Sequence, residues 1–138
     1  MIRSSMAVLV GAFVAAVLVA GIDALGHRAY PLPQGVDWND PVVVARVVRG
    51  MPAGAFVFAV ASWTVAAFAG AGLAARMAPS RPMLHGGLVG ALMLAATIAN
   101  LLMIPHPAWV ILSGLAGVPA CAWLGARIGG MAVTNASR

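Results

Sequence analysis

Charge is scarce in this sequence, and two charged residue types are missing. Lysine and glutamate are absent, and eight arginines with three aspartates make up 8% of the 138 residues, where a soluble domain carries about 25%. Hydrophobic residues account for 62% of the chain. No water-soluble fold of this size has enough interior to bury them, so lipid must be the solvent. The sequence therefore predicts an integral membrane protein whose first partner is the lipid bilayer.

The lone cysteine and the missing lysine exclude several kinds of chemistry. Cys121 has no second cysteine for an intramolecular disulfide or a thiolate metal cluster. The chain also has no phosphate-binding glycine loop and no nucleophilic serine motif. No pattern requires a cofactor, and the scattered arginines form no basic stripe for nucleic acid. We therefore expect no enzyme, no catalytic residues, no cofactor and no nucleic-acid partner.

Long apolar runs are what the sequence does contain. Four of them predict membrane-spanning helices, because each holds roughly 20 residues, or about 30 Å of α-helix, the thickness of the hydrocarbon core. The first run also has the basic start of a secretory signal, but no clean A-x-A site closes it, so we expect it to be retained. Gly129 and Gly130 are expected to end the last one. The predicted spans lie near residues 6–25, 53–76, 83–104 and 108–128.

The segment of residues 27–51 is predicted to be a loop that carries one short surface helix. Asp40 followed by Pro41 supplies an N-cap and a first helical position. From residue 41 to 51 the arginines fall on one face and the valines on the other, as in a helix on a membrane surface, although the β-branched valines also suit an extended segment. The predicted fold class is all-α, a single membrane domain over residues 1–138 with four transmembrane helices and this amphipathic helix.

The placement of the arginines predicts the orientation of the chain. Short cytoplasmic loops are enriched in arginine. With four spans, the side with both termini receives five arginines and the other side three. We therefore expect a multi-pass membrane protein with both termini in the cytoplasm. The two sets are Arg3, Arg76, Arg81, Arg127 and Arg138 against Arg28, Arg46 and Arg49.

Aromatic residues near the ends of the predicted spans have the distribution of an interfacial belt. Such belts form because amphipathic rings prefer the level of the lipid headgroups. Trp63 is different, since it lies within a span and is expected to make a helix contact. The predicted interfacial aromatics are Tyr30, Trp38, Trp109 and Trp123.

Four motifs follow one another in the chain: YPLPQGVDWNDP, SWTVAAFAGAGLAAR, ANLLMIPHPAW and AWLGARI. Together they resemble an uncharacterised family of small bacterial four-helix integral membrane proteins, whose members carry a Y-P-x-P-x-G-x-D loop and an I-P-H-P-x-W corner. The resemblance covers about residues 21–128. It implies the four-span architecture and a place in the bacterial inner membrane, and it brings no activity, ligand or catalytic residue with it.

Polar residues gather on the expected outer side and form a candidate ligand site. Asp23 and Asn100 lie about one turn inside the ends of the first and third spans, and His27 follows Asp23 by four residues. His106 projects from the Pro-His-Pro corner on the same side. An ionisable group inside a span is a functional hypothesis. The structural alternative is that Asp23 pairs with Arg28 or a loop amide, and that Asn100 hydrogen-bonds between helices.

Asp23, His27 and His106 also raise the question of a metal site. Two imidazoles and a carboxylate suit Zn²⁺ or Cu²⁺. Their spacing in the chain matches no recognised ligand signature. We therefore expect no metal.

Small residues spaced four apart occur in every predicted span. In lipid, helices associate by close approach at such residues. We therefore predict a non-catalytic membrane protein that acts by helix packing, as a homo-oligomer or as an accessory subunit of a membrane complex. The alternative is a small transporter or channel-like protein with a polar site at the outer ends of the first and third spans. The small residues are Gly11 with Ala15, Ala66 with Gly70, Gly86 with Gly90, and Gly117, Cys121 and Gly125.

The packing hypothesis predicts an assembly that can be measured. In detergent and in nanodiscs, the purified protein should run as an oligomer or retain a second membrane protein, as measured by size-exclusion chromatography with light scattering. A strictly monomeric protein that co-purifies with nothing would exclude this hypothesis.

Overall fold

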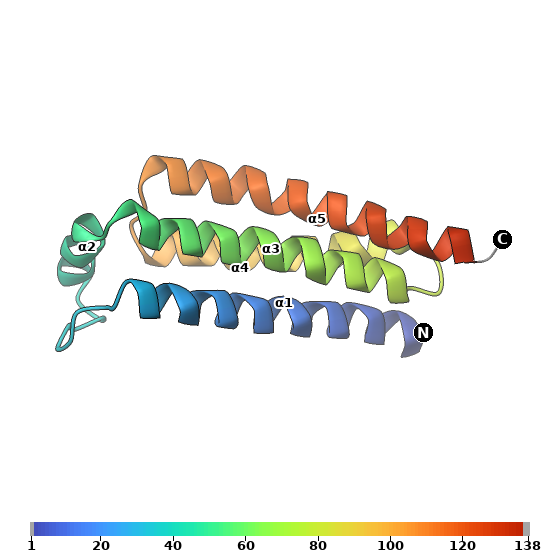
Figure 1. The fold of residues 1–138 in the computed structure, drawn as a ribbon, viewed down its shortest axis with the longest axis horizontal. Helices are drawn as coiled ribbons and strands as arrows, with labels where there is room; N and C mark the ends of the chain where they lie inside the picture. Colours follow the sequence, from blue (N-terminus) through green and yellow to red (C-terminus); the bar gives the residue numbers. More distant parts are fainter. Residues whose placement is uncertain (1, 137–138) are drawn as a thin grey trace.

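The computed structural model describes the backbone of residues 2–136 and the side chains of residues 3–132. Figure 1 shows the long helices running side by side, with the short helix at one end of the bundle and the first and last described residues at the other. The predicted all-α bundle with one short extra helix is confirmed. Within the described residues there are five helices and no strand: α1 (Ile2–Ala29), α2 (Pro41–Gly50), α3 (Ala53–Met77), α4 (Pro82–Met103) and α5 (Ala108–Ala136).

The four long helices, α1, α3, α4 and α5, are each long and apolar enough to cross a membrane. Large apolar side chains point outward: Leu9, Phe13 and Leu102 are 67%, 69% and 83% exposed. The interior face of α3, in contrast, consists mostly of alanine and glycine. A soluble helix directs its large apolar residues to the core. The protein is therefore a multi-pass membrane protein whose large side chains face lipid.

Close backbone contact joins α1 to α3. A Cβ added to Gly70 would lie 2.7 Å from the carbonyl oxygen of Gly11 and 2.9 Å from the Cβ of Ala15. A Cβ on Gly11 would likewise lie 2.6 Å from the carbonyl oxygen of Gly70. Only glycine allows the two backbones to come this close.

The same kind of contact places α5 against its neighbours. A Cβ on Gly125 would overlap the backbone of Phe68 in α3, and one on Gly90 of α4 would lie 2.7 Å from the Cβ of Ala122. Among the described residues, α3 contacts α1, α4 and α5, whereas α1 and α5 do not contact each other. The small-residue faces predicted from the sequence therefore pack the four helices of one chain around α3.

The short helix α2 forms as its sequence predicts. The carboxylate of Asp40 accepts hydrogen bonds from the backbone nitrogens of Val42 and Val43, at 2.8 and 3.3 Å, and thus satisfies free N–H groups at the helix start. Val44 and Val48 are buried, while the arginines of α2 are exposed. The extended alternative for this segment is excluded.

The last helix runs past its predicted end. The prediction that Gly129 and Gly130 stop it is wrong, because α5 continues to Ala136. A Cβ on Gly129 would overlap the backbone of Gly72, and one on Gly130 would lie 3.2 Å from the side chain of Pro82. These glycines are present for close contact with neighbouring segments, which sequence alone does not distinguish from a helix stop.

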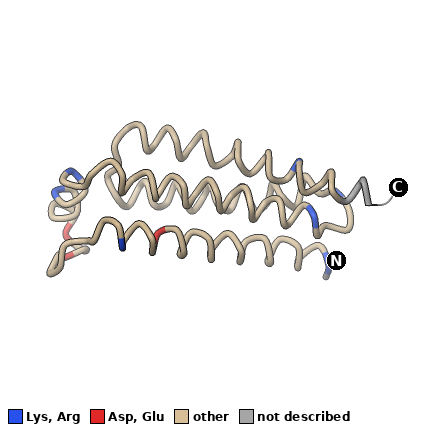
Figure 2. Tube along the Cα trace, viewed as in Figure 1, with Lys and Arg blue, Asp and Glu red and all other residues tan. Residues whose placement is uncertain are grey.

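Charged residues lie towards the two ends of the bundle. Figure 2 shows the aspartates in the half that carries α2, and arginines at both ends. Arg138, which the orientation prediction counts, lies outside the described residues. At the α2 end the arginines share the surface with Asp37, whose carboxylate accepts a hydrogen bond from the backbone nitrogen of Asn39 at 2.9 Å.

Replacing Gly70 with alanine should destabilise the bundle. The new Cβ meets the Gly11 carbonyl oxygen, a backbone atom with no room to move. We expect Gly70→Ala to lower the free energy of unfolding in mixed micelles by about 1–3 kcal/mol. The matched control is Gly87→Ala, because a Cβ there meets no atom within 4 Å, so its higher helix propensity should make it neutral or slightly stabilising. Equal effects of the two variants would contradict the backbone contact.

Candidate functional site

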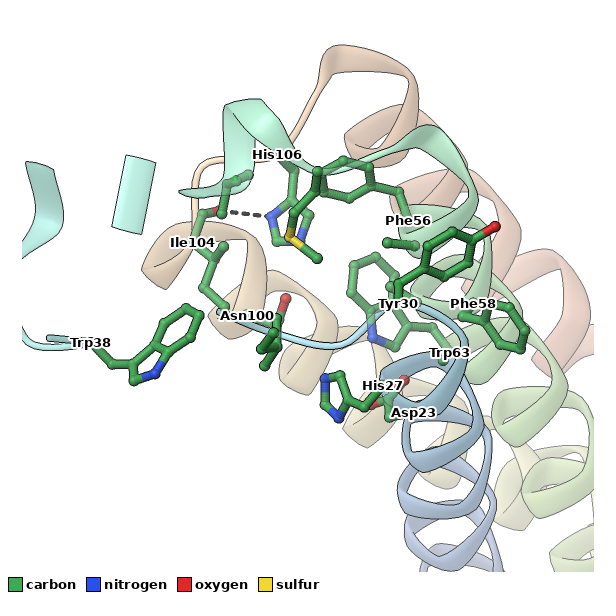
Figure 3. Close-up of a pocket in the computed structure, with 16 residues that line it drawn as sticks. Asp23, His27, Tyr30, Trp38, Phe56, Phe58, Trp63, Asn100, Ile104 and His106 are labelled. Atoms are coloured by element: carbon green, nitrogen blue, oxygen red, sulfur yellow. Dashed lines mark hydrogen bonds between the residues drawn. The ribbon is translucent and has the colours of Figure 1, made fainter. Parts of the chain in front are cut away.

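A cavity of about 300 Å³ lies at the α2 end of the bundle. Its walls come from α1, α3 and α4, from the loop after α1, from the end of α2 and from the corner between α4 and α5. Figure 3 shows this cavity with its labelled side chains. The four residues that the sequence predicts as a polar site all line it: Asp23, His27, Asn100 and His106.

Asp23 and His27 reach the cavity from the same face of α1. This helix continues to Ala29, beyond its predicted end near residue 25, so the two side chains lie one helical turn apart. Asp23 is half-buried and His27 is exposed. Neither side chain has a hydrogen bond or ion pair among the described residues. The expectation that Asp23 pairs with Arg28 or a loop amide is therefore wrong.

Asn100 lines the cavity from the last turn of α4. Its backbone oxygen accepts a hydrogen bond from the nitrogen of Ile104 at 3.0 Å, but its half-buried side-chain amide has no hydrogen bond in the described part of the chain. The expectation that this amide bonds across helices is wrong. Its two donors and its acceptor remain available to whatever enters the cavity.

His106 is held in place by the corner that carries it. Its Nδ1 donates a hydrogen bond to the carbonyl oxygen of Ile104 at 2.7 Å. The ring meets Phe56 and Trp63 edge to face, with centroids 6.1 and 5.8 Å apart. Since a carbonyl oxygen can only accept, Nδ1 carries the proton. In the neutral ring, Nε2 is then left as an acceptor.

A contact between two aromatic rings lines the cavity where α1 meets α3. Tyr30 and Phe58 pack edge to face with centroids 6.2 Å apart. Two glycines make room for them: a Cβ on Gly26 would lie 2.9 Å from the Cβ of Phe58, and one on Gly54 would overlap the hydroxyl of Tyr30. The helices are joined here by interlocking rings, whereas near Gly70 they are joined backbone to backbone.

Trp63 belongs to the site as well as to the core. It is 6% exposed, and its six-membered ring packs against Gly114 of α5. Its indole nitrogen has no hydrogen bond among the described residues. In Figure 3 this nitrogen points to the side of the cavity where His27 and Asp23 lie. The sequence predicts the helix contact of Trp63 but not its unpaired hydrogen-bond donor. It also does not predict Phe56 or Phe58 as lining residues.

The other predicted interfacial aromatics lie at the surface. Trp38 is 48% exposed and forms part of the cavity lining. Trp109 packs edge to face on Phe56 with centroids 6.4 Å apart. The guanidinium carbon of Arg127 lies 5.3 Å from the ring centroid of Trp123, a cation–π contact.

A metal site is not assembled in this cavity. Among the described residues, no three histidine, cysteine or acidic side chains are grouped closely enough to hold a metal ion. Asp23 and His27 lie on α1, and His106 lies on the corner between α4 and α5. The lining of the cavity instead provides hydrogen-bonding side chains and aromatic rings that a ligand could contact.

Comparisons with known protein families, with curated proteins and with solved structures found no match for this chain. The resemblance to small bacterial four-helix membrane proteins stays a prediction. The function has to be inferred from the chemistry of the cavity.

Proposed function

We propose that this protein binds a small solute in the cavity at the α2 end and acts as a small transporter or channel-like protein. One observation supports this above all others. Four polar side chains, from α1, α4 and the corner after α4, line the same cavity. Three of them, those of Asp23, His27 and Asn100, have no hydrogen-bonding partner within the described protein.

The energetics of polar groups favour a binding role over a purely structural one. A polar group that leaves water without a hydrogen bond costs free energy, and a charged one costs more. Side chains that hold a bundle together normally bond to one another or to the backbone. The polar groups of this cavity instead present their donors and acceptors to the space between the helices. They are most stable when water or a bound solute satisfies them.

A binding site also agrees better with these residues than catalysis does. Within the described part of the chain, no serine, threonine, cysteine or lysine nucleophile lines the cavity. Asp23 and His27 make no hydrogen bond to each other that would activate a nucleophile. The proposal therefore includes no chemical step and no cofactor.

A second proposal, assembly with a copy of itself or with another membrane subunit, is favoured by a different observation. Gly87, Ala91 and Ala95 are exposed on one face of α4 at a spacing of four residues. A Cβ on Gly87 meets nothing within 4 Å, so this position makes no close contact with another helix of the chain. If it forms a contact, Ala91→Leu should lower the oligomer fraction measured by light scattering. An unchanged fraction would exclude this face.

We further propose that the protein lies in a bacterial inner membrane with both termini in the cytoplasm and the cavity outside. The arginine pattern supports this orientation, since four of the described arginines lie at the end with the termini and three at the α2 end. The cavity at the α2 end then opens towards the outer face.

The orientation can be measured by thiol labelling in intact cells. In a Cys121→Ala background, Asn100→Cys should react with a membrane-impermeant thiol reagent added outside, because Asn100 lines the open cavity. Met77→Cys, at the opposite end of α3 and 43% exposed there, should react only after the cells are permeabilised. The reverse pattern would show the opposite orientation.

Solute binding can be measured by thermal unfolding in nanodiscs with a panel of small amines, carboxylates and uncharged alcohols that carry branched or aromatic groups. A solute at 100 times its Kd should stabilise the native protein by about 2.7 kcal/mol. Ala59→Trp should abolish this effect, because Ala59 lines the cavity and the indole fills it.

The control for that variant is Leu92→Trp, which places the same side chain at an exposed position of α4 outside the cavity. It should respond to the panel as the native protein does. If no compound stabilises the native protein more than Ala59→Trp, the proposed function is wrong.

A further inference from the structure

The charge of the cavity limits the solutes it can hold. Among the described residues, Asp23 is the only aspartate, glutamate, lysine or arginine that lines it. This is unusual for the chain, whose net charge is +5 and whose basic residues are all arginines. Arg28 is not part of the lining, and Arg49 lines an adjoining pocket that shares Val48, Met51, Phe56 and His106 with the cavity. With histidines taken as neutral, as in the net charge of +5, the charge of the cavity lining has the opposite sign to that of the protein as a whole.

Anionic and uncharged solutes both fit this lining poorly. An anion finds no guanidinium among the described lining residues and is repelled by the carboxylate of Asp23. An uncharged solute displaces water from that carboxylate without supplying a counter-charge, which leaves a desolvated charge unpaired. Of the three classes of solute, only a cation neutralises the carboxylate of Asp23 when it enters the cavity.

The remaining lining distinguishes an organic cation from an inorganic one. Small inorganic cations need several oxygen ligands, and here only the carboxylate of Asp23, the amide of Asn100 and the hydroxyl of Tyr30 carry side-chain oxygen. Aromatic rings attract an ammonium group through their negative faces and also accommodate its apolar substituents. Five lining residues have such rings: Tyr30, Trp38, Phe56, Phe58 and Trp63.

We propose that the solute of this cavity is an organic ammonium ion with an apolar body. The proposal rests on the proposed function and names the class of its ligand. The ammonium group lies against the carboxylate of Asp23, and its alkyl substituents contact the rings of α3. The indole N–H of Trp63 donates to an oxygen of the solute, such as a hydroxyl. This side chain is only 6% exposed, and its N–H has no hydrogen bond among the described residues. The cavity volume of about 300 Å³ is at the lower end of the range of ligand sites, about 300–1,000 Å³, so the solute is small.

Two sources can supply an ammonium group to a site in a membrane protein: a soluble amine, or the headgroup of a lipid such as phosphatidylethanolamine. The chemistry recognised by Asp23 and the aromatic rings is the same in both cases. The two are distinguished by the bilayer in which binding is measured. Nanodiscs of phosphatidylglycerol alone contain no ammonium group, while nanodiscs with added phosphatidylethanolamine contain many.

The test compares three probes of similar shape and different charge. Choline is a cation, and neohexyl alcohol is its uncharged isostere, in which carbon replaces the ammonium nitrogen. The third probe is a related anion, the carboxylate of tert-butylacetic acid. Binding to the full-length protein in phosphatidylglycerol nanodiscs is measured by calorimetry and by tryptophan fluorescence, since Trp38 and Trp63 line the cavity. Choline should bind at least about tenfold more tightly than the alcohol, and the anion should not bind.

Asp23→Asn removes the charge while it keeps the shape of the side chain. It should weaken choline binding at least about tenfold and should not weaken the binding of neohexyl alcohol, because the alcohol no longer desolvates an unpaired carboxylate. Asp37→Asn is the matched control, because it removes one negative charge at the same end of the protein from a residue outside the cavity. Its choline affinity should equal that of the native protein.

Each outcome decides the proposal. If the alcohol binds as tightly as choline, or if Asp23→Asn folds and binds choline as tightly as the native protein, the ammonium proposal is wrong. The isostere comparison needs no variant, so it decides the question even if Asp23→Asn does not fold. If another solute of the wider panel binds and choline does not, the ammonium proposal fails and the proposed function stands. If nothing binds, both fail.

Weaker choline binding in phosphatidylethanolamine nanodiscs identifies the headgroup as a competing source, and unchanged binding identifies a soluble amine.

Discussion

Close contact between helix backbones is the constraint on which this structure depends. In lipid, a leucine gains nothing by moving from the surface to the interior, so the bundle has to be held by packing at small residues. Gly11 and Gly70 supply that contact between α1 and α3, and Gly125 supplies it between α5 and α3. Because these contacts leave no space for large side chains between the touching backbones, Leu9, Phe13 and Leu25 of α1 are left to face lipid.

The two ends of the bundle are built differently, and the cavity lies at the end with the aromatic rings. Towards the termini, α1 and α3 touch through Gly11 and Gly70. Towards α2, the rings of Tyr30 and Phe58 pack against each other beside the contact of Gly26 with Phe58, and Trp63 extends from α3 to α5. The cavity is lined by these rings together with Asn100 of α4.

The sequence predicts the fold well because apolar runs, proline positions and the Asp40 cap are local signals. It fails at Gly129, since a glycine in a helix contact and a glycine at a helix stop look alike until the neighbouring backbone is known. The four polar lining residues are predictable, because the topology brings the ends of α1 and α4 to one side. Their missing partners are not predictable, because a hydrogen bond depends on side-chain directions that spacing does not determine. The rings of Phe56 and Phe58 are missed for a related reason: in an apolar span, an aromatic residue gives no sign of whether it faces lipid, core or cavity.

The Pro-His-Pro corner has a consequence for the entropy of binding. Pro105 and Pro107 restrict the backbone on both sides of His106, and the bond from Nδ1 to Ile104 restricts the imidazole ring as well. A solute that contacts Nε2 meets a group that has little freedom left to lose. Asp23 and Asn100, which have no hydrogen-bonding partner among the described residues, would lose rotamer freedom on binding the proposed solute. The cavity thus combines one restricted polar side chain with two that keep their rotamer freedom, an arrangement that would suit several solutes of related shape better than a single one.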